Sequence, residues 1–198
     1  MEKIAIIGSG SWGTALGIYL AKRGKMINIW SFDEEEKKLI NEQRKCKFLP
    51  EVEIPENIKC STNMEEVVTG AEIIIHVTPS KFTRETVKKY KNYITENQIL
   101  IMCSKGFEAT TLLPLNKVVE EELPNIKYAN LSGPSHAEEV SRGIPTAMVT
   151  ASEDDKINEI VTNLFNIWSC FNSSNKNGII RINISSNFIC NINNIYTR

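Results

Sequence analysis

Three glycines near the start of the chain have a spacing that can hold a diphosphate. Gly8, Gly10 and Gly13 form the pattern G-x-G-x-x-G, between the apolar run Lys3–Ile7 and a stretch with apolar residues at helical spacing. In such a turn the first glycine permits a tight bend, and the second lets a pyrophosphate approach the backbone. The third lets the helix and the strand pack closely. The free N–H groups of the helix then face the phosphates.

The rival interpretation is a tight strand-to-helix turn that binds nothing. The context favours a dinucleotide, because a second strand follows at Met26–Trp30. Asp33 comes about 20 residues after Gly13, where an acidic side chain can hold the adenosine ribose hydroxyls. It is equally well placed to cap the next helix, because Asp33 and Glu36 resemble a capping box. Both roles stay open for Asp33.

A lysine follows another buried strand. Gln98–Cys103 is an apolar run, and Lys105 lies just beyond it, between Ser104 and Gly106. An ammonium group at that place can stabilise negative charge that develops on an oxygen. For Lys105 alone, a loop lysine in solvent is the simpler interpretation.

Another polar stretch, Ser132–Glu139, follows the strand Tyr128–Leu131. Ser135 is placed to cap the helix after it, which would present N–H groups to an anion. His76 lies in a further strand, Glu72–Val77. We interpret it as a packed or capping side chain rather than a catalytic base, because nothing near it in the sequence orients it.

Alternating strands and helices predict an α/β fold with a doubly wound, mostly parallel sheet of the Rossmann type. Because such sheets bind ligands beyond the carboxyl ends of their strands, the glycine turn, Pro79, Lys105 and Gly133–Ser135 should line one crevice. The expected strands are Lys3–Ile7, Met26–Trp30, Ile58–Cys60, Glu72–Val77, Gln98–Cys103, Tyr128–Leu131 and, as the last one, Pro145–Thr150. The expected helices follow the glycine turn and cover Glu34–Lys45, Met64–Thr69, Phe82–Ile94, Leu113–Leu123 and Glu153–Phe165.

The composition narrows the class of partner. The 198 residues carry a net charge of −1, which argues against a nucleic-acid or anionic-membrane surface. No apolar run approaches the roughly 20 residues that span a bilayer. The five cysteines form no C-x-x-C pair and no metal-ligand spacing. We therefore expect reduced thiols, no metal site and a cytoplasmic protein.

The composition changes near residue 168. Every Asp and Glu lies at or before Glu159, and Cys170–Arg198 contains no Ala, Leu, Val, Asp or Glu. That segment also lacks a helical period and has little variety for a packed core. We therefore divide the chain into a dinucleotide-binding domain, 1–167, and an aberrant low-complexity tail, 168–198, which we expect to be poorly ordered.

These stretches together resemble the N-terminal domain of bacterial NAD(P)-dependent glycerol-3-phosphate dehydrogenase. The glycine turn is shared by many dehydrogenases, whereas Ser-Lys-Gly together with Gly-Pro-Ser-x-Ala-Glu-Glu is far more specific. The same pair disfavours another two-domain hydroxy-acid or keto-acid reductase. The matching segments occur in the family's order: Gly8–Leu16, Phe48–Pro50, Val77–Ser80, Ser104–Gly106 and Leu131–Val140.

The resemblance implies hydride transfer with NAD(H) or NADP(H) that interconverts dihydroxyacetone phosphate and sn-glycerol 3-phosphate for phospholipid synthesis. The cofactor supplies the hydride chemistry, and the protein orients the reactants and polarises the substrate. A homodimer stays an open alternative to a monomer. The resemblance also implies site residues: Ser11, Trp12 and Ala137 on the cofactor, Lys105 on cofactor and substrate, and Gly133 and Ser135 on the substrate.

The chain departs from the family at two places. Phe32 stands where the family commonly has an arginine that grips the 2′-phosphate of NADP, and Asp33 would repel that phosphate, so we expect a preference for NAD(H). Nothing after Phe165 resembles the family's helical second domain, which supplies the lysine that gives and takes the proton. We therefore expect a truncated product of out-of-frame reading. The alternative to the enzyme is a dinucleotide-binding module without catalytic turnover.

Overall fold

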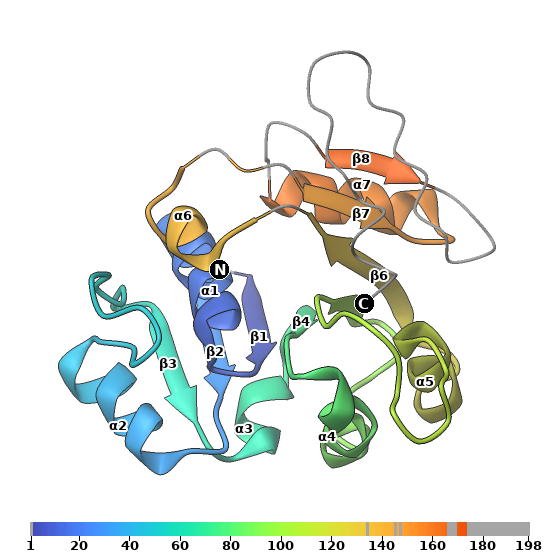
Figure 1. The fold of residues 1–198 in the computed structure, drawn as a ribbon, viewed down its shortest axis with the longest axis horizontal. Helices are drawn as coiled ribbons and strands as arrows, with labels where there is room; N and C mark the ends of the chain where they lie inside the picture. Colours follow the sequence, from blue (N-terminus) through green and yellow to red (C-terminus); the bar gives the residue numbers. More distant parts are fainter. Residues whose placement is uncertain (1, 134, 145, 147, 166–169, 174–198) are drawn as a thin grey trace.

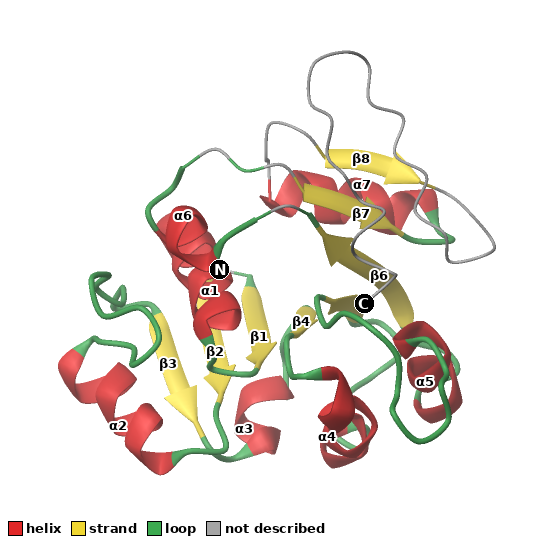
Figure 2. Ribbon diagram, viewed as in Figure 1, coloured by secondary structure: helices red, strands yellow, loops and turns green. Residues whose placement is uncertain are grey.

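One mixed sheet with helices on both faces forms the protein (Figures 1 and 2). The computed structural model describes residues 2–133, 135–144, 146, 148–165 and 170–173. The strand order is β3-β2-β1-β4-β5-β6-β7-β8, and every neighbouring pair is parallel except β6 and β7. The strands are β1 (Lys3–Ile7), β2 (Met26–Trp30), β3 (Ile58–Ser61), β4 (Ile73–His76), β5 (Ile99–Met102), β6 (Lys127–Ser132), β7 (Met148–Ala151) and β8 (Cys170–Ser173).

The described helices divide between the two faces of the sheet. They are α1 (Ser11–Lys22), α2 (Glu34–Gln43), α3 (Met64–Val68), α4 (Thr83–Tyr90), α5 (Leu115–Glu122), α6 (Ala137–Ser141) and α7 (Asp155–Phe165), with a short 3₁₀ turn at Ser80–Phe82. Residues of α1, α2, α6 and α7 pack in one hydrophobic cluster, and residues of α3, α4 and α5 pack in another. The predicted doubly wound α/β fold is confirmed.

The first strand shows why these strands read as unbroken apolar runs. Ile4 and Ile6 of β1 belong to the first cluster, whereas Ala5 and Ile7 belong to the second. Successive side chains of a strand point to opposite faces, so a strand covered on both sides needs apolar residues at every position.

The strand order reverses beside β1. This strand lies between β2 and β4, so the chain winds outward from β1 in two opposite directions. At such a switch point the loops at the carboxyl ends of the two central strands diverge, and the space between them is where open α/β sheets hold their ligands. The loops after β1 and β4 therefore frame the expected site.

The prediction that Pro145–Thr150 is the last strand is wrong. The described backbone adds β8, which pairs in parallel with β7 at the edge of the sheet. Backbone hydrogen bonds are enough to hold an edge strand, so the strand needs no apolar run. For that reason the sequence pattern did not predict it. The expected poor order of the remaining tail concerns residues outside the described part of the chain.

The helices with predicted bounds are all shorter in the structure, and α2, α3 and α7 differ by only one or two residues at one end. The helix expected over Phe82–Ile94 splits into the 3₁₀ turn and α4, which ends at Tyr90, although Ile94 still packs against the second cluster. The helix expected from Leu113 starts at Leu115, because Pro114 takes the N-cap position. Both corrections leave the loops around the switch point where the sequence placed them.

Candidate functional site

A crevice of about 930 Å³ opens at the switch point, within the size range of small-molecule sites. It is lined by residues at or just beyond the carboxyl ends of β1, β2, β4 and β5, by the start of α6, by Phe48, and by Glu85, Thr86 and Lys89 of α4. Gly133, a predicted substrate contact, is buried just past β6 and does not line it. The other ten predicted site residues all do: Gly8, Gly10, Ser11, Trp12, Gly13, Phe32, Asp33, Lys105, Ser135 and Ala137.

The three glycines of the turn have the geometry that their spacing predicts. Gly8 has φ of +123°, where side chains are strained, and a Cβ there would lie 3.1 Å from the backbone oxygen of Val77. A Cβ on Gly13 would lie 2.1 Å from the backbone oxygen of Gly8, so α1 packs too closely on the turn for any side chain. A Cβ on Gly10 would meet nothing within 4 Å and would occupy open space at the crevice.

The start of α1 leaves its backbone donors free for a ligand. Gly10 is the N-cap and supplies no side-chain hydrogen bond, and the first turn contains no acidic residue. The first N–H groups of a helix have no intrahelical partner, and the helix dipole favours negative charge there. The turn is therefore suited to an anion such as a diphosphate.

The acidic residue after β2 is a helix cap. Asp33 is the N-cap of α2, and its carboxylate accepts a hydrogen bond from the Glu35 N–H at 2.8 Å. The expected capping box is wrong, because the Asp33 N–H donates to Ser31 Oγ at 3.1 Å instead of to Glu36. The ribose role of Asp33 stays a prediction, supported by its place in the crevice lining.

Glu36 is a site residue that sequence reasoning treated only as half of that capping box. It lines the crevice although its residue is only 3% exposed, and its Oε1 has no hydrogen-bond partner among the described residues. Phe32 differs from Glu36 in both burial and polarity, because its side chain is apolar and the residue is 85% exposed. The rim after β2 thus combines an exposed aromatic ring with two acidic side chains, one at the surface and one buried.

Lys105 lies at the other rim, exposed and in the crevice lining. Its exposure agrees with a loop lysine, and its position agrees with a ligand contact. The preceding Ser104 donates a hydrogen bond from its hydroxyl to the backbone oxygen of Thr78 at 2.5 Å. Gly106 follows with φ of +108°, a conformation that suits glycine. Both neighbours therefore help to define the path of the loop.

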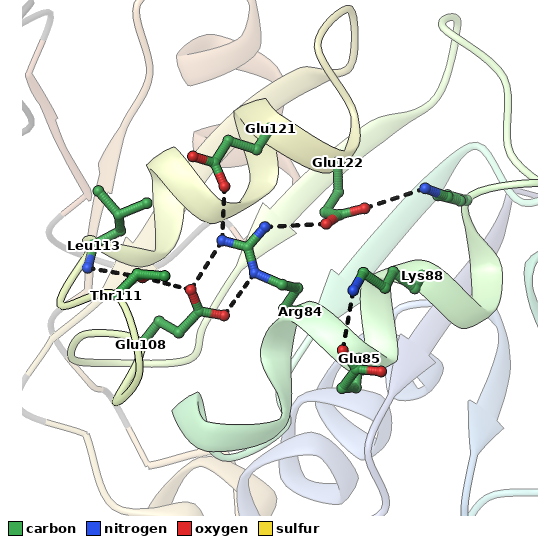
Figure 3. Close-up of polar contacts among 9 residues, drawn as sticks. Arg84, Glu85, Lys88, Glu108, Thr111, Leu113, Glu121 and Glu122 are labelled. Carbon is green, nitrogen blue, oxygen red and sulfur yellow. Dashed lines mark hydrogen bonds and ion pairs between the residues drawn. The ribbon is translucent and has the colours of Figure 1, made fainter.

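A cluster of ion pairs fastens the segment after Lys105 to the helices behind it (Figure 3). Arg84 of α4 binds Glu108 through two hydrogen bonds of 2.7 and 2.9 Å, and it also pairs with Glu121 and Glu122 of α5. Hydrogen bonds from Arg84 lower the pKa of the Glu108 carboxyl to about 2. Residues 24 positions apart form this clamp, so no local sequence pattern indicated it.

The predicted cap at Ser135 is wrong. The N-cap of α6 is His136, and its side chain makes no capping hydrogen bond. The backbone is still extended at His136, so the helix begins too late for the Ser135 hydroxyl to reach the N–H groups that a cap satisfies. Ser135 lines the crevice instead, together with His136 and Glu138, which sequence reasoning did not select.

His76 is a packed side chain, as interpreted from the sequence. It is fully buried, with Nδ1 3.1 Å from the Tyr90 hydroxyl and Nε2 2.7 Å from Thr78 Oγ1. Burial lowers the pKa of the imidazole to about 3, so the ring is neutral at physiological pH. Tyr90, which orients the imidazole, comes 14 positions later in the sequence, at the end of α4. The sequence contained no pattern that predicted this contact.

Three described cysteines, Cys46, Cys60 and Cys103, are free and buried. Burial raises the pKa of the Cys103 thiol to about 12, which suits an inert side chain rather than a nucleophile. Within the described ranges, no helix has the length and apolar character to cross a membrane. The same residues contain no group of three or more His, Cys, Asp or Glu that could hold a metal ion.

Comparison with known proteins identifies relatives of the whole described core. A glycerol-3-phosphate dehydrogenase [NAD(P)+] from Fusobacterium nucleatum is 44% identical over 169 residues, which span 83% of this chain and 50% of that protein. The enzyme of the same name from Agathobacter rectalis is 41% identical over 166 residues, 83% of this chain and 49% of that protein. The chain thus spans about half the length of the curated relatives that it matches.

Solved structures agree with the sequence relatives. The crystal structure of glycerol-3-phosphate dehydrogenase from Coxiella burnetii superposes with a TM-score of 0.83 at 28% identity, covering 88% of this chain and 55% of that one. The family model of the NAD-dependent glycerol-3-phosphate dehydrogenase N-terminus matches residues 3–158, most of the present chain. The chain therefore belongs to the NAD-dependent glycerol-3-phosphate dehydrogenase family and corresponds to its N-terminal part.

Proposed function

We propose that this chain is the cofactor-binding part of a glycerol-3-phosphate dehydrogenase and holds NAD(H) or NADP(H) in the crevice at the switch point. One observation carries the proposal: the uncapped start of α1 and the open space at Gly10 face a crevice of dinucleotide size. The diphosphate would rest against Gly8–Gly13. Ser11, Trp12 and Ala137 would contact the rest of the cofactor.

The substrate we propose is dihydroxyacetone phosphate or sn-glycerol 3-phosphate. When bound, the nicotinamide supplies the hydride chemistry. The Lys105 ammonium would stabilise negative charge on the carbonyl oxygen or on the phosphate of the substrate, because it projects from the rim of the same crevice. Ser135 lines that rim, whereas Gly133 is buried and outside the lining. These assignments rest on position in the crevice and on the family resemblance.

We further propose that NAD(H) binds more tightly than NADP(H). Phe32 has no group that can donate to a 2′-phosphate, and the carboxylate of Asp33, which would repel that phosphate, lies at the same rim. Phe32→Arg should therefore narrow the difference between the two nucleotides. Tighter NADPH binding by the unaltered chain would overturn the preference.

Binding is directly measurable, because Trp12 and Trp30 line the crevice and should transfer excitation energy to bound NADH. Gly10→Ala is the matched variant. Its Cβ meets no protein atom within 4 Å, so the free energy of unfolding should stay within about 0.5 kcal/mol of the unaltered chain. NADH affinity should fall at least tenfold, because the methyl group occupies the diphosphate's place. If neither nucleotide binds, or if G10A binds NADH normally, the proposal is wrong.

The second candidate is a dinucleotide-binding module without turnover. It is favoured by the extent of the match, since the chain spans about half the length of its curated relatives. An NADH oxidation assay with dihydroxyacetone phosphate separates the candidates: the enzyme oxidises NADH, whereas the module binds it unchanged. The cytoplasmic location, the homodimer and the role in phospholipid synthesis stay predictions alongside these two.

A further inference from the structure

A line of hydrogen bonds leads from the protein core to the crevice. It starts at the fully buried Tyr90 of α4, passes through the imidazole of His76 at the end of β4, and ends at the hydroxyl of Thr78. Thr78 is 7% exposed and lines the crevice. The function proposed above assigns no role to any of the three side chains, although buried polar groups of this kind are costly unless every donor is satisfied.

The donors along this line can be counted. The tyrosine hydroxyl and the neutral imidazole each have one proton to donate. If His76 carried its proton on Nδ1, that proton would go to the Tyr90 oxygen, and the Tyr90 proton would have no acceptor among the described residues. An unsatisfied buried donor costs about 1–3 kcal/mol.

The other tautomer satisfies both groups. With the proton on Nε2, His76 donates to Thr78 Oγ1 at 2.7 Å, and Tyr90 donates to Nδ1 at 3.1 Å. Burial lowers the pKa of the imidazole, so the ring stays neutral at physiological pH and Nδ1 remains able to accept from Tyr90. Thr78 Oγ1 then acts as an acceptor toward the core, and its own proton remains for a partner on another side.

The backbone of Thr78 is held beside the glycine turn. Its carbonyl oxygen accepts the hydrogen bond from Ser104, and its Cγ2 would lie 3.6 Å from a Cβ built on Gly8. With His76 in the Nε2–H tautomer, no described residue accepts a hydrogen bond from the Thr78 hydroxyl. The free proton therefore belongs to a threonine that is packed against the first glycine of the turn and lines the crevice.

We propose that the Thr78 hydroxyl donates a hydrogen bond to an acceptor oxygen of the dinucleotide beside Gly8, and that His76 and Tyr90 are positioning residues that keep its proton available. The inference rests on the proposed function, because it needs a nucleotide in the crevice. It assigns Thr78 to ligand binding and gives the buried His76 a task without proton transfer.

The binding test compares Thr78→Val with Thr78→Ser in the full chain, using the NADH titration described above. Valine keeps the shape and removes the hydroxyl, so NADH affinity should fall about tenfold, equal to about 1.4 kcal/mol. Serine keeps the hydroxyl and should bind within twofold of the unaltered chain. Thermal unfolding verifies that each variant is folded, and a T78V protein that binds NADH normally would overturn the inference.

A second measurement does not depend on affinity. The chain has two histidines, so ¹⁵N chemical shifts of the imidazole nitrogens, assigned with His136→Gln, report the tautomer of His76 directly. We expect the Nε2–H form, unchanged between pH 8 and pH 5. The Nδ1–H form would overturn the inference even if T78V weakened binding. If the unaltered chain binds neither NADH nor NADPH, the proposed function itself fails, and this outcome differs from normal binding that T78V leaves intact.

Discussion

The two rims of the crevice are held in place by different means. The rim formed by Gly8–Gly13 and Phe32–Glu36 relies on close approaches at the glycine turn, on one helix cap and on the Ser9–Ser31 hydrogen bond. The rim that carries Lys105 relies on Arg84, which comes from a helix earlier in the chain and grips Glu108. Local geometry therefore supports the proposed cofactor contacts, whereas distant ion pairs support the proposed substrate contact.

This difference decides which substitutions should matter. At the first rim, damage should come from residues in the motif itself, because each glycine is needed for a specific close approach. At the second rim, a substitution of Arg84, which lies outside the crevice lining, should affect the site as much as a substitution in the lining. The reason is that Arg84 fixes the segment that follows Lys105. The four predictions that follow test this contrast.

The largest effect is expected from Gly13→Ala. The new Cβ would lie 2.1 Å from the Gly8 backbone oxygen, so either the turn or α1 must move. We expect a loss of about 3–5 kcal/mol in the free energy of unfolding, typical of severe overpacking, together with loss of NADH binding. Chemical denaturation followed by tryptophan fluorescence measures it, with G10A as the control. A G13A protein of normal stability would contradict the close packing of this rim.

The next effect is expected from Arg84→Met at the second rim. It leaves Glu108 and Glu121 without their cation and leaves Glu122 with Lys91 alone; Glu108 and Glu122 are largely buried. We expect a loss of about 2–4 kcal/mol in unfolding free energy. Dihydroxyacetone phosphate should bind more weakly in the presence of NADH, because the Lys105 loop is released. The control is Glu121→Gln, whose exposed pair should be worth under about 1 kcal/mol. Equal effects of the two variants would remove the contrast between the rims.

The same ion pair predicts a dependence on pH. The pKa of the Glu108 carboxyl is about 2 in the folded protein, below its usual value of 4.5. A lowered folded-state pKa stabilises the protein above the unfolded-state value, and this contribution is lost as the pH falls toward 2. The stability advantage of the unaltered chain over Glu108→Gln should therefore be largest above about pH 5 and shrink as the pH approaches 2. Denaturation at pH 7, 4 and 3 tests the sign, and an advantage that grows in acid would refute the assignment.

The smallest effect is expected at Asp33. Asp33→Ala removes the helix cap and should cost about 1 kcal/mol in unfolding free energy, whereas Asp33→Asn keeps a good cap and should cost little. The pair also separates the two roles considered for this residue. If the carboxylate holds a ribose, both variants lose NADH affinity; if it only caps α2, D33N binds NADH as the unaltered chain does.

Sequence reasoning predicted what local physical chemistry determines. Strands buried on both faces, such as Ile4–Ile7, must be apolar throughout, so the sheet could be read from the chain. The glycine turn could be predicted because each glycine of the motif has a separate role that excludes a side chain. Both patterns consist of residues that are neighbours in sequence, which is why they could be recognised, although the Val77 oxygen that limits the space at Gly8 comes from a distant part of the chain.

The misses share the opposite property. The Arg84–Glu108 clamp and the His76–Tyr90 contact join residues 24 and 14 positions apart, and only the folded sheet brings them together. The cap at Ser135 failed by a single residue, because the sequence does not show where an extended segment turns helical. The strand β8 forms through backbone hydrogen bonds that leave no side-chain pattern.

One buried hydroxyl has a consequence for how a nucleotide would be recognised. Ser31 Oγ accepts hydrogen bonds from both the Ser9 hydroxyl, at 2.8 Å, and the Asp33 N–H, at 3.1 Å. A single oxygen thus joins the loop proposed for the phosphates to the loop proposed for the sugar. An adenosine diphosphate group would therefore bind two loops that are already fixed relative to each other. The entropy cost of ordering these loops is incurred during folding and does not reduce the binding affinity.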